Sequence, residues 1–207
     1  MSKASAKTIF LDIGGVLLTN GWGSDSRKEA AARFGLDYDE LNTLHNFVFN
    51  VYEIGSITLD QYLDTVVFHT SRPFTREAFK EFLFACSQPF PEILSWLKEW
   101  KKDCGARIIA INNEGKELND YRVAAFGLHD CFDAFISSCE VQLRKPDPRI
   151  FQLAMGIAMA QPEQCIYFDD RPMLVHAAQQ LHIRAYHHTD FLTTRNILEQ
   201  FKKENNK

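Results

Sequence analysis

The stretch Thr8-Ile9-Phe10-Leu11-Asp12-Ile13-Gly14-Gly15 decides how this chain is interpreted. Its first residues are apolar or β-branched, which is typical of a buried strand, and Asp12 comes just before two glycines. In open α/β sheets, ligands bind beyond the carboxyl ends of the strands. A strand also ends in Asp for turn chemistry alone, so this segment by itself leaves both interpretations open.

Two later segments favour a binding site. Arg144-Lys145-Pro146-Asp147-Pro148 forms one of them, and Phe168-Asp169-Asp170 ends another apolar run. In their order and wide spacing, DIGGVLL, RKPDPRIF and YFDDRP resemble three of the four signature segments of the haloacid dehalogenase-like hydrolases. That superfamily consists largely of phosphatases, and the resemblance covers nearly the whole chain.

Beyond residue 90, apolar β-branched runs alternate with helical patterns. The expected strands span residues 107–111, 134–137, 165–168 and 183–186. The expected helices span residues 91–102, 117–126, 148–159, 173–181 and 189–203. Asp147 is expected to cap the helix that begins at Pro148. This alternation predicts a parallel sheet with helices on both faces and right-handed crossovers.

Between the first strand and residue 88, only helices are expected. They span residues 27–34, 38–53, 58–69 and 75–87, and Thr58 with Gln61 forms a plausible capping box. An all-helical block at this place predicts a small cap domain. We therefore expect a Rossmann-like α/β core of residues 1–19 and 89–207, with a helical cap of residues 20–88 inserted after the first strand.

Composition excludes several classes of protein. The 207 residues allow one substantial core with a small insertion, and the net charge of −4 with scattered basic residues argues against a nucleic-acid partner. Five cysteines without a C-x-x-C pair indicate buried packing residues, in place of disulfides or a zinc site. No segment resembles a signal peptide or is long enough to span a membrane, so we expect a soluble, cytoplasmic protein.

The strand ends of such a sheet would bring five polar side chains to one edge. They belong to Asp12, Asn112, Lys145, Asp169 and Asp170. Neighbouring carboxylates raise one another's pKa, and a hard dication relieves that repulsion. Mg²⁺ suits a site of carboxylates, a backbone carbonyl, waters and a substrate phosphate.

The resemblance implies a role for each of these residues. Asp12 matches the nucleophile, which forms an aspartyl-phosphate that water then hydrolyses. Lys145 matches the lysine that screens the phosphate charge. Asp170 matches the direct metal ligand, Asp169 the acid that holds metal-bound water, and the Gly14 carbonyl a further ligand. The alternative from the residues alone is a surface lysine before a helix for Lys145 and a helix cap for the acidic pair, although two adjacent acids exceed what capping needs.

Two positions depart from the family pattern. Where the family usually has a second Asp as general acid and base, this chain has Gly14. Where it usually has Ser or Thr, this chain has Asn112, followed by Asn113, and both amides are candidate phosphate ligands. His45 or His69 in the cap would be a substitute acid or a structural residue. Trp22 would shield the site or anchor the cap.

These features predict a Mg²⁺-dependent phosphatase that acts on a small phosphorylated metabolite. One alternative is a 2-haloacid dehalogenase-like hydrolase, which needs no metal. Another is a catalytically weak protein that binds a phosphorylated ligand. Neither the substrate nor the oligomeric state is indicated by the sequence.

Overall fold

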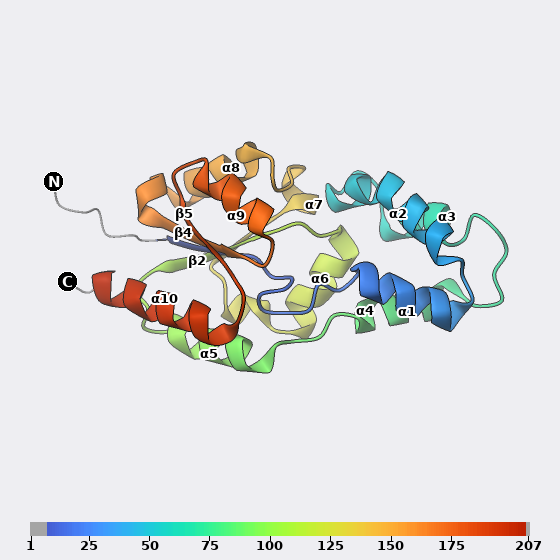
Figure 1. Ribbon diagram of the computed structural model, residues 1–207, viewed down its shortest axis with the longest axis horizontal. Coiled ribbons are helices and arrows are strands. Elements are labelled where there is room, and N and C mark those ends of the chain that lie inside the picture. Colours follow the sequence, from blue (N-terminus) through green and yellow to red (C-terminus); the bar gives the residue numbers. More distant parts are fainter. Residues whose placement is uncertain (1–7, 206–207) are drawn as a thin grey trace.

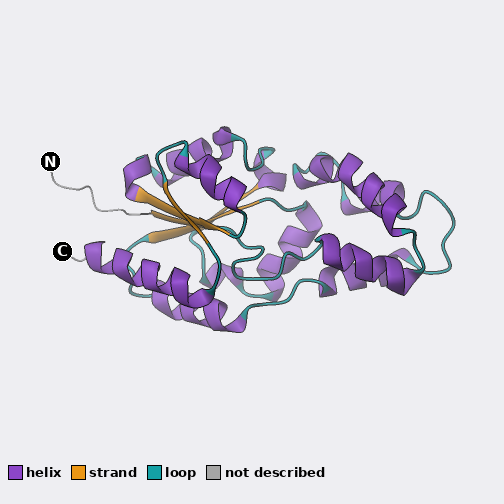
Figure 2. Ribbon diagram, viewed as in Figure 1, coloured by secondary structure: helices purple, strands orange, loops and turns teal. Residues whose placement is uncertain are grey.

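The computed structural model describes residues 8–205, and its centre is a five-stranded parallel sheet in the order β3-β2-β1-β4-β5. The strands are β1 (Thr8–Leu11), β2 (Arg107–Asn112), β3 (Ala134–Ser137), β4 (Cys165–Asp169) and β5 (Arg184–His187). Leu11 pairs with Ala110 of β2 on one side and with Phe168 of β4 on the other. All carboxyl ends therefore meet at one edge, and the direction of winding changes beside β1. Figure 2 shows the strands grouped together between helices.

Helices cover both faces of the sheet (Figure 1). Alternate residues of β1 point to opposite sides: Ile9 and Leu11 belong to one hydrophobic cluster, and Phe10 to another. The first cluster includes α5 (Pro91–Lys101) and α10 (Phe191–Asn205). The second includes α8 (Pro148–Ala158) and α9 (Pro172–Gln179). This is the predicted α/β class.

Four helices between β1 and α5 surround a third hydrophobic cluster. They are α1 (Ser24–Phe34), α2 (Tyr38–Glu53), α3 (Leu59–Val66) and α4 (Arg76–Ala85). The capping box of Thr58 and Gln61 is present, and the Thr75 side chain caps α4. Figure 1 shows these four helices, called the helical cap below, at one end of the molecule, with the sheet and α10 toward the other end. No helix in residues 8–205 is both long and apolar enough to cross a bilayer.

The two chain segments that join cap and core are hydrogen-bonded to each other. The backbone N–H of Thr19 donates to the Gln88 carbonyl at 2.8 Å, and the N–H of Gln88 donates to Thr19 Oγ1 at 2.9 Å. Thr19 Oγ1 also donates to the Cys86 carbonyl at 2.8 Å. We call residues 17–20 together with 86–90 the double linker.

Several element boundaries differ from those expected. β1 ends at Leu11, so Asp12 and Ile13 lie in the turn. Helix α1 begins at Ser24, three residues early, because its polar first turn carries no apolar periodicity. Helix α10 begins at Phe191 because the Asp190 carboxylate accepts hydrogen bonds from Thr193. The helix α7 (Ser138–Val141) was not expected, since one turn is too short to show a period.

The remaining elements connect these layers. Helix α6 (Lys116–Ala125) follows β2, and two 3₁₀ turns span Leu128–Asp130 and Pro162–Gln164.

Gly55 brings the cap against the backbone of the core. It follows α2 with φ of +71°, and a Cβ atom there would lie 2.2 Å from the carbonyl oxygen of Cys139 in α7. Only a glycine allows both the left-handed conformation and this close approach. Gly35, with φ of +64° after α1, has no atom within 4 Å of the equivalent position.

These two glycines form a matched pair for a test. Gly35→Ala should lower the free energy of unfolding by about 1–2 kcal/mol, the cost of a side chain in the left-handed region. Gly55→Ala adds the collision with Cys139 and should lose about 2–5 kcal/mol. Urea unfolding of both variants measures the difference, and equal losses would contradict a tight contact between cap and core.

Candidate active site

The polar residues of the sequence motifs meet at the carboxyl edge of the sheet. Asp12 directly follows β1, Asn112 is the last residue of β2, and Asp169 the last of β4. One oxygen from each of Asp12, Asp169 and Asp170 lies within 4.8 Å of the other two. The sheet therefore assembles the acidic cluster that the sequence predicted.

Lys145 lies inside this cluster, with 1% of its side chain exposed. Its Nζ atom is 3.1 Å from Asp12 Oδ1 and 2.7 Å from Asp169 Oδ2. Burial alone lowers the pKa of the ammonium group, but the attraction of Asp12 and Asp169 outweighs it, and the net shift is upward. The interpretation of Lys145 as a surface lysine is therefore wrong.

Asn113 holds the backbone of Lys145 in place. Its Nδ2 donates to the Lys145 carbonyl at 2.9 Å, and its Oδ1 accepts from the Lys145 N–H at 2.8 Å. Because both its Oδ1 and its Nδ2 are engaged, the Asn113 side chain fixes the position of Lys145, while the second N–H of Nδ2 remains for a ligand in the cavity, whose wall includes Asn113.

The carboxylates fit a hard dication. Asp170 Oδ1 is buried without a hydrogen-bond partner among the described residues, and Oδ2 accepts from Asn20 Nδ2 at 2.9 Å. Burial raises the pKa of Asp12 to about 6, with Asp169 adding to the shift and Lys145 opposing it. A cation with oxygen ligands, such as Mg²⁺, would satisfy the free oxygen and offset the repulsion.

The two acids of the pair have different partners. Asp169 Oδ1 accepts from the Arg171 N–H at 2.9 Å, so Asp169 does stabilise the turn before α9. Asp170 makes no such capping bond in the described structure and comes close to Gly15, where a Cβ atom would lie 2.1 Å from Asp170 Oδ2. The capping interpretation thus accounts for Asp169 only in part, and for Asp170 not at all.

The space beside Gly14 holds a guanidinium group. Gly14 is not among the residues with positive φ, and a Cβ atom on it would lie 3.0 Å from Asn20 Oδ1. The two terminal nitrogens of Arg122 would lie 3.7 and 3.8 Å from that Cβ atom. Arg122 Nη1 donates in turn to Glu114 Oε2 at 2.6 Å. The side-chain space of residue 14 is therefore adjacent to a buried Arg122–Glu114 ion pair.

The sequence analysis did not assign a functional role to two buried glutamates near this site. Burial raises the pKa of Glu114 to about 7, against the opposing effect of Arg122. Burial also raises the pKa of Glu53, at the end of α2, although Arg144 Nη2 lies 2.6 Å from Glu53 Oε2. The position of Glu114 just after the strand-end asparagines was the one signal that could have pointed to it.

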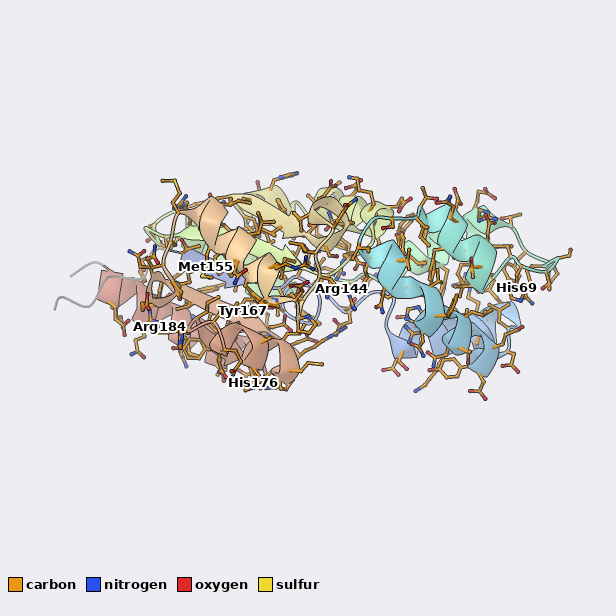
Figure 3. The ribbon with its side chains drawn as sticks, turned by 90° about the horizontal axis from the view of Figure 1, so that it is seen from above. His69, Arg144, Met155, Tyr167, His176 and Arg184 are labelled. Atoms are coloured by element: carbon orange, nitrogen blue, oxygen red, sulfur yellow. The ribbon has the colours of Figure 1, made fainter. Side chains whose placement is uncertain are left out.

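Core and cap together enclose a cavity of about 250 Å³. Its walls carry Asp12, Gly14, Asn20, Trp22, Gly23, Ser24, Arg27, His45, Phe49, Glu53, Asn112, Asn113, Glu114, Arg122, Arg144, Lys145, Arg171 and Leu174. Asp169 and Asp170 are not part of this lining and contact it through Lys145 and Asn20. Figure 3 labels Arg144 between the core helices and the cap. The volume is smaller than that of typical drug-sized ligand sites, about 300–1,000 Å³.

The two cap histidines lie in different surroundings. His69 is at the outer end of the cap, 3.4 Å from Glu40, and does not line the cavity (Figure 3). His45 lines the cavity, and its Nδ1 lies 2.8 Å from the Tyr62 hydroxyl. Burial lowers the pKa of His45 to about 3, so the ring is neutral near pH 7 and is a weak candidate for an acid.

Trp22 combines the two roles that the sequence left open. Its Nε1 donates to the Tyr62 hydroxyl at 2.7 Å, and its ring meets Phe79 edge-on with centroids 5.7 Å apart. It therefore belongs to the hydrophobic core of the cap and also forms part of the cavity wall.

A class of hydrolases is defined by a parallel α/β sheet with a carboxylate after its central strand, a buried lysine and an acidic pair at the end of the neighbouring strand. A family model described as haloacid dehalogenase-like hydrolase matches residues 6–182. The chain belongs to this family.

Individual relatives are more distant. Human haloacid dehalogenase-like hydrolase domain-containing protein 3 is 28% identical over 101 residues, which are 47% of this chain and 39% of that protein. Glyceraldehyde 3-phosphate phosphatase of Methanopyrus kandleri is 26% identical over 94 residues, which are 45% of this chain and 40% of that protein. The matched part of the chain thus spans about two fifths of the length of these relatives.

A solved structure shares the fold. It is that of an enzyme of this family from Bacteroides thetaiotaomicron, in a complex with magnesium and inorganic phosphate. The TM-score is 0.72 at 19% identity, and the match covers 87% of this chain and 93% of the other.

The acidic cluster predicts a response to Mg²⁺ in the absence of any substrate. A ligand at about 100 times its Kd stabilises the folded state by about 2.7 kcal/mol, or about 5–10 °C in the Tm of a chain of this size. Asp170→Asn should abolish this rise, because it removes the carboxylate with the free oxygen. Asp120→Asn, an exposed acid on α6, should respond like the native protein. Thermal melts of the native protein and both variants, with and without Mg²⁺, measure these shifts in Tm. An unchanged Tm of the native protein would refute the metal site.

Proposed function

We propose that this protein is a Mg²⁺-dependent phosphatase that acts on a small phosphorylated molecule through an aspartyl-phosphate on Asp12. The observation that carries the proposal is the contact of buried Lys145 with Asp12, in the wall of a cavity large enough for a small molecule. An ammonium group in this position favours a phosphate beside the carboxylate, whose own charge would otherwise repel it.

The hydrogen bonds of Asp12 leave one oxygen for attack. Oδ1 accepts from the Ile13 N–H at 2.8 Å and lies next to Lys145, so Oδ2 is the nucleophilic atom. Mg²⁺, held by Asp12, Asp170 and the Gly14 carbonyl with Asp169 behind them, would neutralise phosphate charge. Lys145 contributes the same stabilisation from the protein side.

Asn112 is fixed in a way that suits a phosphate ligand. Its Nδ2 donates to Asn119 Oδ1 at 3.0 Å, and its Oδ1 accepts from the Ser137 hydroxyl at 2.9 Å. These bonds orient the amide and leave its second N–H for a ligand in the cavity. Asn112 would then replace the hydroxyl that the family usually has at this position.

The relatives support the same reaction class. The Methanopyrus relative is named a phosphatase, and the Bacteroides structure is a complex with magnesium and inorganic phosphate. The alternative of halide displacement from a 2-haloacid needs no metal, and the free oxygen of Asp170 argues against it. A protein that only binds a phosphorylated ligand is distinguished from both by the absence of turnover.

Replacing Asp12 tests the nucleophile. Asp12→Asn keeps the shape of the side chain but removes the attacking charge, so hydrolysis of an aryl phosphate with Mg²⁺ should fall to background. The Tm should confirm that the variant folds. Retention of a tenth of native turnover, about 1.4 kcal/mol of barrier, would exclude Asp12 as nucleophile. Mg²⁺-independent chloride release from 2-chloropropionate would instead establish the dehalogenase alternative.

The acid that Gly14 lacks has a replacement in this proposal, namely Glu114. The guanidinium group of Arg122 lies between Glu114 and the side-chain space of residue 14, and Glu114 lines the cavity. Its pKa of about 7 leaves a protonated fraction near neutral pH, which a proton donor to the leaving group requires.

Leaving-group dependence tests this assignment. Alkyl phosphates need a proton on the departing oxygen and aryl phosphates do not, so Glu114→Gln should lower kcat about 10²–10⁴-fold on alkyl phosphates alone. The native rate on alkyl phosphates should fall as the pH rises through about 7, and the variant should lack this limb.

Glu53→Gln is the matched control, because Glu53 is also buried, paired with an arginine and part of the cavity wall. It should change alkyl and aryl rates equally. A selective loss in Glu53→Gln would transfer the role of proton donor to the cap.

A further inference from the structure

Arg27 is a buried cation without a carboxylate partner. It lies in the first turns of α1 with 8% of its surface exposed, and no ion pair links it to an acid within residues 8–205. The ionisable groups that influence its pKa are two tyrosines, Tyr62 and Tyr38, and burial shifts this pKa downward. A buried charge without a counter-charge destabilises the folded protein, so its presence calls for an explanation.

The hydrogen bonds of Arg27 fix the guanidinium group but do not use all its donors. Nε and Nη2 donate to Asn42 Oδ1, at 3.2 and 3.0 Å, and Nη1 donates to the Trp22 carbonyl at 3.0 Å. Of the five N–H groups of an arginine, two remain without a protein acceptor in the described structure. They belong to a side chain that lines the cavity shared with Asp12 and Lys145.

The N-terminus of α1 borders the same part of the cavity. Gly23 is its N-cap and has no side chain to cap the helix, and Gly23 and Ser24 both line the cavity. The free N–H groups of a first helical turn and the helix dipole favour an anion. The acid of this turn, Asp25, has a fully exposed side chain and pairs with Lys28 at 3.4 Å.

The other cations of the cavity wall have a carboxylate partner or are exposed. Lys145 contacts Asp12 and Asp169, Arg122 contacts Glu114, and Arg144 contacts Glu53. Arg171 is exposed, so water screens its charge. Arg27 is thus the buried cation of this wall for which the described residues supply no anion.

We propose that Arg27 and the N-terminus of α1 form a second anion site, so that the substrate is a small phosphate monoester with a further anionic group, a carboxylate or a second phosphate. This inference rests on the proposed phosphatase function. The phosphate to be cleaved lies against Asp12 Oδ2, beside Lys145, and the second anion receives the two free N–H groups of Arg27. The neutral His45 ring lies beside this site without competing for the anion.

Binding measurements test the second site without any need for turnover. Titration calorimetry on Asp12→Asn protein with Mg²⁺ compares 3-phosphoglycerate with glycerol 3-phosphate, which has a hydroxymethyl group in place of the carboxylate. Propane-1,3-diol bisphosphate and its monophosphate form the corresponding pair for a second phosphate. At least one probe with two anionic groups should bind about tenfold more tightly than its partner with one, and the probe that does so identifies the second group.

Substitution of Arg27 should remove this preference. In the Asp12→Asn protein, Arg27→Gln should raise the Kd of the preferred probe at least tenfold and change the Kd of its partner probe less than threefold. Arg27→Lys should give an intermediate Kd for the preferred probe. Lys28→Gln, which removes the exposed neighbouring cation, should match the parent protein. The native protein should show the same preference in kcat/KM.

Two outcomes overturn the proposal. One is equal binding of both members of each probe pair, which decides the matter even if Arg27→Gln does not fold. The other is a preference that Arg27→Gln leaves intact. Failure of the phosphatase function has a different signature, since no phosphate ester would then be hydrolysed by the native protein with Mg²⁺, whatever the binding preference.

Discussion

The ammonium group of Lys145 between the carboxylates of Asp12 and Asp169 is the interaction on which the site depends. Two carboxylates from adjacent strand ends repel each other, and the sheet register keeps both at one edge. The buried ammonium group of Lys145 offsets this repulsion. The Asn113 side chain fixes the backbone of Lys145 through two hydrogen bonds. Removing Lys145 would leave two buried carboxylates without their cation, and loss of one partner of a buried ion pair typically costs about 3–5 kcal/mol. The same two ion pairs therefore position the side chains of the candidate site and stabilise this edge of the sheet.

The fold was accessible from the sequence because its signals are local. Alternating apolar runs predicted every strand, and apolar spacing predicted the four helices between β1 and α5, with α2 predicted over its full range. The errors lie where local signals are weak. The polar first turn of α1 lacks periodicity, and α7 is a single turn. The order of the strands follows from pairing between distant segments, which no local pattern contains.

The sequence predicted site residues only where the residue type itself restricts the chemistry. Asp12, Lys145 and Asp170 were predicted from motifs, and the structure brings them together. The sequence could not show that Arg122 fills the space beside Gly14, or that Glu114 and Arg27 face the same cavity, because these contacts join segments from different elements. Burial changed the interpretation of His45, whose neutral ring comes from its surroundings and cannot be predicted from its place in a helix.

The double linker and Gly55 hold the helical cap against the core at two separate places. Thr19 and Gln88 join the two connecting segments by hydrogen bonds, and Gly55 meets the Cys139 carbonyl of α7. Arg27 belongs to α1 and Lys145 to the core, and both line the same cavity. The spacing of these two cations therefore follows from how the helical block packs on the core, and that spacing sets the length of a ligand that can contact both.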